Sequence, residues 1–189
     1  EFGEFMEPSK CTVHYDRIRN AYLAVKNCRY PVIGAINGSA AGAGCAFAGC
    51  CDVLIAAQGA KFALSEIKVG IIGADGYASL MVPEKVLRYM AFSGNPLLAE
   101  QIAQWGGIWK VVPREQVLEE AQKLAAEFAQ NARRALILWK QCLNENYEHE
   151  LPKKFNNNLQ ATIAYQPYHD FKEASTAFIE KRVPEYDEQ

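Results

Sequence analysis

One turn of small residues and one nearby acid could together form a reaction centre. The turn runs from Asn37 to Gly44, and a short apolar helix is expected to begin within Gly42-Ala43-Gly44. At a helix start the first backbone N–H groups lack an intrahelical acceptor, and the helix dipole adds positive potential. Such amides can stabilise negative charge that develops on a carbonyl oxygen. Taken alone, the spacing favours a tight strand-to-helix crossing, because it differs from that of a nucleotide-binding loop.

Two acids are candidates for proton transfer beside this turn. Glu66 follows the apolar run Phe62-Ala63-Leu64, and partly apolar surroundings raise the pKa of a carboxyl group, which suits proton shuttling. Asp75, in the segment Gly73-Ala74-Asp75-Gly76, could be a second acid or base across a substrate from Glu66. Each acid also has a structural interpretation, a solvent-facing residue at a strand end for Glu66 and a turn residue for Asp75. Spacing alone favours the structural interpretation for both.

The other polar residues that could do chemistry favour structural interpretations. Asp52, ahead of Val53, is expected to be a helix-to-strand turn residue. The three histidines, His14, His149 and His169, lie in separate segments and form no metal-ligand pair, so we expect surface histidines and no metal site.

Six cysteines show no metal-ligand spacing, and four of them lie inside apolar segments, where a free thiol behaves as a small hydrophobic group. Buried thiols indicate a reducing compartment, such as the cytoplasm, a mitochondrial matrix or a peroxisome. Disulfides or a catalytic thiol are the alternative.

Apolar runs alternate with helical patterns through the first two-thirds of the chain, which predicts an α/β architecture with parallel strands. The predicted strands are Val32–Ile36, Val53–Ala57, Lys61–Leu64 and Ile108–Val112. The predicted helices around them are Thr12–Cys28, the segment from the turn to Cys50, Pro83–Phe92, Leu97–Trp105 and Glu115–Gln130.

The last third is expected to be helical throughout, because it lacks glycine and has helical apolar spacing. The expected helices are Arg133–Tyr147, Leu151–Tyr165 and Phe171–Lys181, with aromatic residues at Trp139, Phe155, Tyr165, Phe171 and Phe178. We expect residues 1–130 to form the core, and residues 131–189 to pack on that core or on a partner chain.

Composition excludes several classes of protein. Of the 189 residues, 50% are hydrophobic and 22% are charged, which suits a soluble globular domain with a substantial core. The net charge of −2, spread along the chain, argues against an electrostatic nucleic-acid binder. No apolar run approaches the roughly 20 residues that span a bilayer, and the N-terminus lacks a signal-peptide pattern.

The stretch PVIGAINGSAAGAGCAFAGCCDVLIAAQGAKFALSEIKVGI resembles the central signature of the crotonase superfamily, the enoyl-CoA hydratase/isomerase family. The resemblance continues through Trp105-Gly106-Gly107-Ile108-Trp109-Lys110-Val111-Val112-Pro113 to the closing Ala177-Phe178-Ile179-Glu180-Lys181-Arg182. It implies a spiral of ββα turns, a helical trimerisation region at residues 131–189, and a homotrimer or dimer of trimers. It also implies acyl-CoA thioester substrates, with coenzyme A as part of the substrate and no separate cofactor.

The resemblance implies an oxyanion hole of two backbone amides around the thioester carbonyl. Ala43 matches the position of the second amide, and Gly44 belongs to the same turn. Hydratases of the family use two glutamates, of which Glu66 matches one, whereas Ala46 occupies the position of the other. One carboxylate can still carry a proton between two carbons, so double-bond isomerisation is slightly favoured over hydration. Asp75 lies one residue beyond the position at which some isomerases and a dehalogenase place a catalytic aspartate.

The resemblance also suggests that the chain begins just after the segment that supplies the first oxyanion amide. Phe2 to Phe5 looks like the tail of that segment, so we expect a fragment, a processed product or the visible remainder of a longer chain. Two alternatives to an isomerase follow, an enoyl-CoA hydratase and a non-catalytic scaffold of the same fold whose oligomer presents a binding surface.

Overall fold

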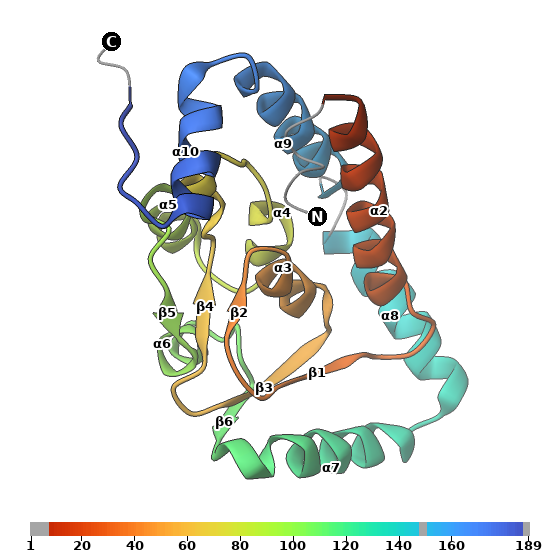
Figure 1. Ribbon diagram of the computed structural model, residues 1–189. Coiled ribbons are helices and arrows are strands. Elements are labelled where there is room, and N and C mark those ends of the chain that lie inside the picture. The colour runs from red at the N-terminus through yellow and green to blue at the C-terminus, as the bar shows by residue number, and fades with distance from the viewer. Residues whose placement is uncertain (1–7, 148–150, 187–189) are drawn as a thin grey trace.

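The computed structural model describes residues 8–147 and 151–186, and its strands form two three-stranded sheets (Figure 1). The first sheet has the order β1-β3-β6, with all strands parallel. The second has the order β2-β4-β5, in which β2 and β4 are parallel and β4 and β5 antiparallel. The strands span Ile33–Ile36 (β1), Ala40–Ala41 (β2), Val53–Ala57 (β3), Lys61–Ala63 (β4), Leu97–Leu98 (β5) and Lys110–Val112 (β6).

Helices cover both sheets and make up the end of the chain. They span Pro8–Lys26 (α2), Ala43–Cys50 (α3), Asp75–Ala78 (α4), Glu84–Ser93 (α5), Ala99–Gln104 (α6), Val117–Ala129 (α7), Arg133–Tyr147 (α8), Leu151–Tyr165 (α9) and His169–Glu180 (α10). Two short 3₁₀ helices, η1 (Glu66–Val69) and η2 (Arg114–Gln116), complete the described elements. The predicted α/β architecture is confirmed, and the predicted helices of the last third agree with α8, α9 and α10 to within two residues.

Two features of the sheets differ from the sequence prediction. Both β2 and β5 are two residues long, too short for an apolar alternation, and β5 occupies the start of a segment predicted to be helical. Because β5 runs antiparallel to β4, the second sheet is mixed rather than wholly parallel. Asp75, expected in a turn, is the first residue of the four-residue helix α4.

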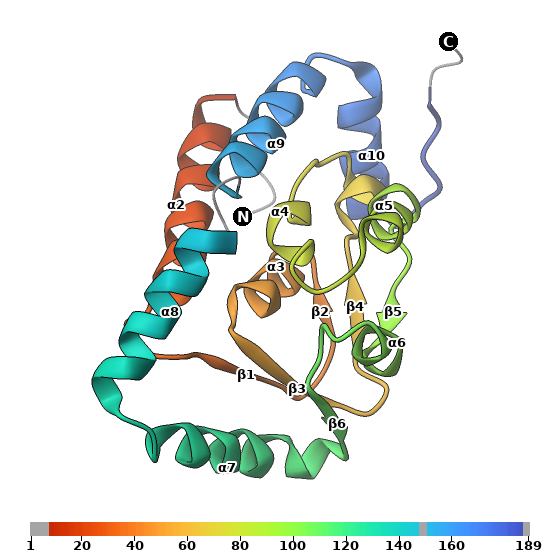
Figure 2. The same ribbon diagram turned by 180° about the vertical axis from the view of Figure 1, so that it is seen from behind.

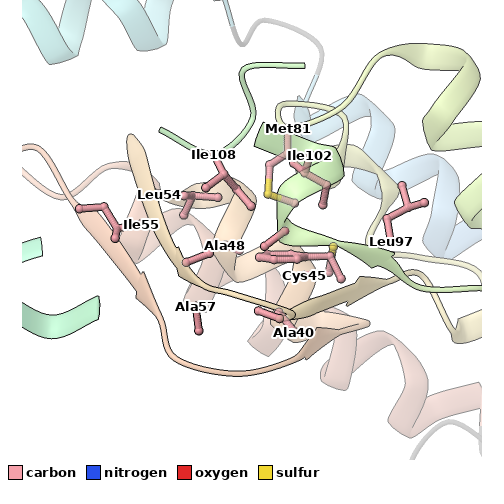
Figure 3. Close-up of a cluster of buried hydrophobic side chains, with 14 of the residues drawn as sticks. Ala40, Cys45, Ala48, Leu54, Ile55, Ala57, Met81, Leu97, Ile102 and Ile108 are labelled. Carbon is pink, nitrogen blue, oxygen red and sulfur yellow. The ribbon is translucent and has the colours of Figure 1, made fainter. Parts of the chain in front are cut away.

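The main core lies between the sheets and the helices that cover them. Figure 3 shows side chains from α3, β3 and α6 gathered in this core, among them Cys45, Leu54 and Ile102. All three are at most 3% exposed. This packing fixes the position of α3, whose first residues form the small-residue turn.

Close contact between α3 and α4 depends on glycine. A Cβ added at Gly49 would lie 2.2 Å from the carbonyl oxygen of Tyr77, so any larger residue would force the two helices apart. This approach brings α4, which begins with Asp75, against the helix that begins at Ala43.

The end of the chain returns to the core. In Figures 1 and 2, α7 runs beside the first sheet, where it contacts β1 and β3, and α9 and α10 lie at the opposite end of the molecule. Helix α9 contacts α2 and α4, and α10 contacts η1. Phe171 is 1% exposed, whereas Trp139 of α8 is 66% exposed. The tail therefore packs on the core through α9 and α10. The division of the chain at residue 130 stays a prediction.

Cysteines are buried less often than expected. Cys45 and Cys50 are buried, whereas Cys28 and Cys142 are exposed at a helix end and on α8, and all five cysteines described in this respect are free thiols. Within residues 8–147 and 151–186, no helix has both the length and the apolar character needed to cross a membrane.

Candidate active site

Backbone pairing between β2 and β4 brings the small-residue turn to Glu66. Ala41 is paired with Ala63, and the N–H of Gly42 donates to the carbonyl of Ala63 at 2.9 Å. Because β2 and β4 are parallel, the residues that follow both strands emerge at the same edge of the sheet. Strand pairing therefore brings Gly42 and Glu66 together at this edge.

Gly42 allows the carboxylate to come close to the turn. Its φ of 54° lies in the left-handed region, and a Cβ built there would be 3.1 Å from Oε1 of Glu66. Helix α3 begins at the next residue, Ala43, so its first N–H groups point out of the helix start beside this carboxylate. Gly44 lies in the same first turn, is exposed, and is not among the described residues that line the cavities below.

Burial raises the pKa of the Glu66 carboxyl group, which suits it to carry a proton near neutral pH. Desolvation is the main cause that raises its pKa from 4.5 to about 7, and the charge of Asp75 raises it further, against a backbone hydrogen bond that lowers it. Its Oε2 is buried and has no hydrogen-bond partner within the described residues. Near neutral pH the protonated and ionised forms are both populated, as general acid–base chemistry requires.

Glu66 and the turn line a cavity of about 430 Å³, which we call the turn cavity. Its wall also includes Gly42, Ala43, Ile18 and Tyr22, so residues of the helix start and the carboxylate line one space that is partly open to solvent. A volume of this size suits a small ligand or one end of a larger one.

A second cavity, of about 460 Å³, lies on the other side of Glu66, and we call it the α5 cavity. It is lined by Asp75 and by residues of α5 and η1, and it shares Glu66, Ile71 and Gly73 with the turn cavity. Glu66 therefore stands in the wall common to both spaces. The structure brings Asp75 to the α5 cavity rather than to the space that Ala43 lines.

Asp75 is held by the helical tail. The side-chain amide of Asn158, in α9, donates a hydrogen bond to its Oδ1, and Asn158 is 9% exposed. The charge of Asp75 acts on Glu66 by raising its pKa. Asn158 has no sequence signal of its own, because its neighbours in the chain are further asparagines in a polar stretch.

Ala46 does not leave a gap in the site. It is fully buried and packs in a cluster with Tyr15, Tyr22, Cys50 and Tyr77. The ring of Tyr22 makes edge contacts with Phe47 and Tyr77, at centroid distances of 4.8 and 5.1 Å. Aromatic packing thus occupies the surroundings of the position at which the family resemblance expects a second carboxylate.

Tyr15 and Tyr22 line the turn cavity and were missed as site residues from the sequence. Their spacing of seven residues, with Ile18 between them, places them on one face of a helix. That spacing could have predicted a common buried face, but not that the face borders a cavity. Burial raises the pKa of the Tyr22 hydroxyl, and the charge of Glu66 contributes to this shift.

The remaining candidates fall outside the site, with one exception. Asp52 accepts hydrogen bonds from Val32 N at 2.6 Å and Lys140 Nζ at 2.7 Å, which makes it a structural residue. His169 is exposed, but His14 lines the turn cavity rather than lying on the open surface as expected. His149 lies outside the described residues. Within the described part of the chain, no three His, Cys, Asp or Glu side chains form a metal-binding group.

Comparisons with known proteins show which family this chain resembles in sequence and fold. The family model described as enoyl-CoA hydratase/isomerase matches residues 3–189. A protein of Dictyostelium discoideum named "Probable enoyl-CoA hydratase, mitochondrial" is 35% identical over 189 residues, which cover 96% of this chain and 68% of that protein.

Solved structures also match. The crystal structure of carnitinyl-CoA hydratase from Mycobacterium avium is 32% identical with a TM-score of 0.77, covering 83% of this chain and 62% of that one. An enoyl-CoA hydratase from Mycobacterium avium subsp. paratuberculosis, 24% identical with a TM-score of 0.85, covers 94% and 74% and shows the fold. The chain spans 54% to 68% of the length of five curated relatives that it matches.

Proposed function

Because the chain belongs to the enoyl-CoA hydratase/isomerase family of the crotonase superfamily, we propose that it moves a proton on an unsaturated acyl-CoA thioester, with Glu66 as the proton carrier. Family membership and the crotonase-like α/β fold confirm the resemblance read from the sequence. The reaction and the roles of individual residues are our proposal.

The observation that supports it most is the placement of Glu66. A largely buried carboxyl group whose pKa is raised to about 7 lies against Gly42, at the start of α3 and in the wall of the turn cavity. A thioester carbonyl in the turn cavity would point its oxygen at the Ala43 amide, and Gly44 would complete the turn. The carbons next to that carbonyl would then lie beside the carboxylate.

The favoured reaction is double-bond isomerisation. Glu66 removes a proton from carbon 2 of a 3-enoyl thioester, and the electron pair passes through the carbonyl to give a dienolate oxygen. The Ala43 amide stabilises this oxygen, and Glu66 returns the same proton to carbon 4 as the double bond settles between carbons 2 and 3. Asp75 helps by raising the pKa of Glu66, and no cofactor is required beyond the coenzyme A of the substrate.

Hydration is the second candidate, favoured by the names of the relatives. Adding water needs one group to activate water and another to protonate carbon, and Ala46 offers no carboxylate. Isomerisation needs only one acid, which Glu66 supplies. A non-catalytic scaffold, the third candidate, also fits the aromatic packing around Ala46.

The test is turnover of the protein with 3-enoyl-CoA and 2-enoyl-CoA thioesters, followed by the absorbance of the conjugated enoyl thioester. Glu66→Gln should lower isomerase turnover by about 10²- to 10⁴-fold, because the proton carrier is lost. The matched control Glu127→Gln changes an exposed glutamate on α7 and should retain activity. Unchanged turnover in Glu66→Gln would remove Glu66 from the mechanism, and tight thioester binding without turnover would favour the scaffold.

We also propose that the chain forms a homotrimer or a dimer of trimers. Leu138, Trp139 and Leu143 of α8 are 54%, 66% and 47% exposed and give this helix an apolar outer surface. Covering this surface with a second copy would remove apolar area from water. A monomer seen by light scattering at micromolar concentration would contradict the proposal. A reducing compartment is proposed for the same chain because its described cysteines are free.

A further inference from the structure

The connection between β1 and β2 contains Asn37-Gly38, the one place in the sequence at which a glycine follows an asparagine. We propose that Asn37 is a site of spontaneous covalent modification, where the Gly38 nitrogen displaces ammonia and water then turns the asparagine into aspartate or isoaspartate. Asn37 lines neither the turn cavity nor the α5 cavity, and the proposal does not depend on the proposed function.

Asn37 and Gly38 are open to this reaction because their surroundings do not hold them. Both lie outside helices and strands, and Asn37 is exposed. Within the described residues, neither the side-chain amide of Asn37 nor the N–H of Gly38 has a hydrogen-bond partner in the protein. A Cβ built on Gly38 would meet no atom within 4 Å. The Gly38 nitrogen therefore has room to approach Cγ of Asn37.

The reaction needs water and no other reagent. The Gly38 nitrogen gives up its proton and bonds to Cγ of Asn37, the bond from Cγ to Nδ2 breaks, and ammonia leaves with that proton. Water then opens the resulting succinimide ring at one of its two C–N bonds. Opening at Cγ restores the main chain and leaves aspartate. Opening at the main-chain carbonyl leaves isoaspartate, whose main chain runs through Cβ and Cγ and is one carbon longer.

Isoaspartate would lengthen the main chain where it passes from one sheet to the other. Asn37 directly follows β1, which belongs to the first sheet, and the next strand, β2, belongs to the second (Figure 1). Strand β2 pairs with β4 over two residues, and the N–H of Gly42 after it donates to the carbonyl of Ala63. An extra carbon just before so short a strand shifts this pairing, and with it the start of α3.

Mass spectrometry of the aged protein tests the proposal. The folded protein is kept at mildly alkaline pH, and samples are digested with trypsin, which releases the peptide Tyr30–Lys61. Asn37 is the only asparagine in this peptide, and replacing its NH₂ by OH should raise the peptide mass by about one mass unit. The peptide that contains Asn131, which is exposed but followed by alanine, is the internal control and should keep its mass over the same time.

The protein unfolded in guanidinium chloride calibrates the rate. If the fold held Asn37, the reaction would require the structure to open, and the folded protein would react about 10³-fold or more slowly than the unfolded one. Because Asn37 is not held, the folded protein should react within about tenfold of the unfolded rate. A larger difference between the two rates would overturn the proposal.

Two neighbouring variants identify the attacking nitrogen. Gly38→Ala adds a methyl group that meets no neighbour, at a position outside the left-handed region, so this variant should fold. The methyl group crowds the attacking nitrogen and should slow the mass gain by at least about tenfold. Ser39→Ala changes the next, exposed residue and should keep the wild-type rate. Equal rates in Gly38→Ala and Ser39→Ala would overturn the assigned chemistry.

Hydrogen exchange at the Gly42 N–H measures the effect on the turn. The isoaspartate form, separated from the aspartate form by chromatography, should exchange this N–H at least about tenfold faster than the unmodified protein. Asn37→Asp is the matched control, because it carries the new charge on an unaltered main chain, and it should exchange within about 3-fold of the wild type. Equal exchange in the isoaspartate form and in Asn37→Asp would overturn the effect assigned to the longer main chain.

Discussion

The sheet core and the helical tail both position parts of the site, but they do so by different means. In the core, the N–H of Gly42 donates to the carbonyl of Ala63, and strand pairing brings Glu66 to the turn. In the tail, two side chains of α9 hold the segment after η1: Thr162 binds Ile72 of the loop, and Asn158 binds Asp75 at the start of α4. Backbone pairing tolerates most changes of side chain, whereas the tail's contribution depends on two particular residues.

Thr162 shows how specific the tail's contacts are. Its hydroxyl lies 3.1 Å from the carbonyl and 3.3 Å from the N–H of Ile72, and it is fully buried. Tyr15 of α2 donates to the same carbonyl, and its hydroxyl lies 2.9 Å from that of Thr162. Two helices thus converge on the backbone of Ile72, next to Ile71 and Gly73 in the wall between the cavities.

The largest expected change in unfolding free energy comes from Glu66, which the core positions. Because backbone pairing holds Glu66 in place, Glu66→Gln should remove its burial cost without moving the chain. The pKa of Glu66 is raised from 4.5 to about 7, so its ionised form destabilises the folded state once the pH exceeds the unfolded pKa. The variant should gain up to about 3 kcal/mol of unfolding free energy at pH 8.

The pH dependence separates this cause from general packing effects. Near pH 4 the carboxyl group is protonated in both states, so the variant and wild type should differ little there. Chemical denaturation at both pH values measures the difference. If Glu66→Gln were less stable than the wild type at pH 8, the charge of Glu66 would stabilise the fold, and strand pairing alone would not hold this part of the core.

On the tail side, Thr162→Val should destabilise the protein. The methyl groups fill the same volume, but the Ile72 peptide loses a buried hydroxyl partner, which costs about 1 to 3 kcal/mol. Thr176→Val on α10 is the matched control, since this hydroxyl is only partly buried and should contribute less than about 0.5 kcal/mol. Equal effects of the two changes would show that the tail holds the loop by packing rather than by hydrogen bonds.

The same contrast explains how far the sequence alone could lead. Apolar runs of three to five residues predicted β1, β3, β4 and β6, and the position of Glu66 after β4 indicated that it would lie near the turn. These features depend on local patterns. The ends of α8 and α9 were also predictable, because helical spacing and breaks are local signals.

Contacts between residues far apart in the chain leave no local pattern in the sequence from which they could be predicted. Asn158 lies 83 residues from Asp75, and Thr162 lies 90 residues from Ile72, so only the fold brings each pair together. The surroundings of Ala46 could not be predicted for the same reason. The sequence shows a missing carboxylate, whereas the structure shows tyrosines from α2 and α4 packed around that position.

The smallest expected effect joins the two regions, because the tail holds Asp75 and Asp75 acts on the core residue Glu66. The charge of Asp75 raises the pKa of Glu66, so Asp75→Asn should lower the pKa of Glu66. In a plot of kcat/KM against pH, the acidic limb should then move to lower pH by less than about one unit. Asp16→Asn, which changes an exposed acid 3.1 Å from Arg19, should leave the limb in place. A limb that stays fixed in Asp75→Asn, or moves to higher pH, would show that burial alone sets the proton affinity of Glu66. The tail would then contribute to the shape of the site and not to its acid–base chemistry.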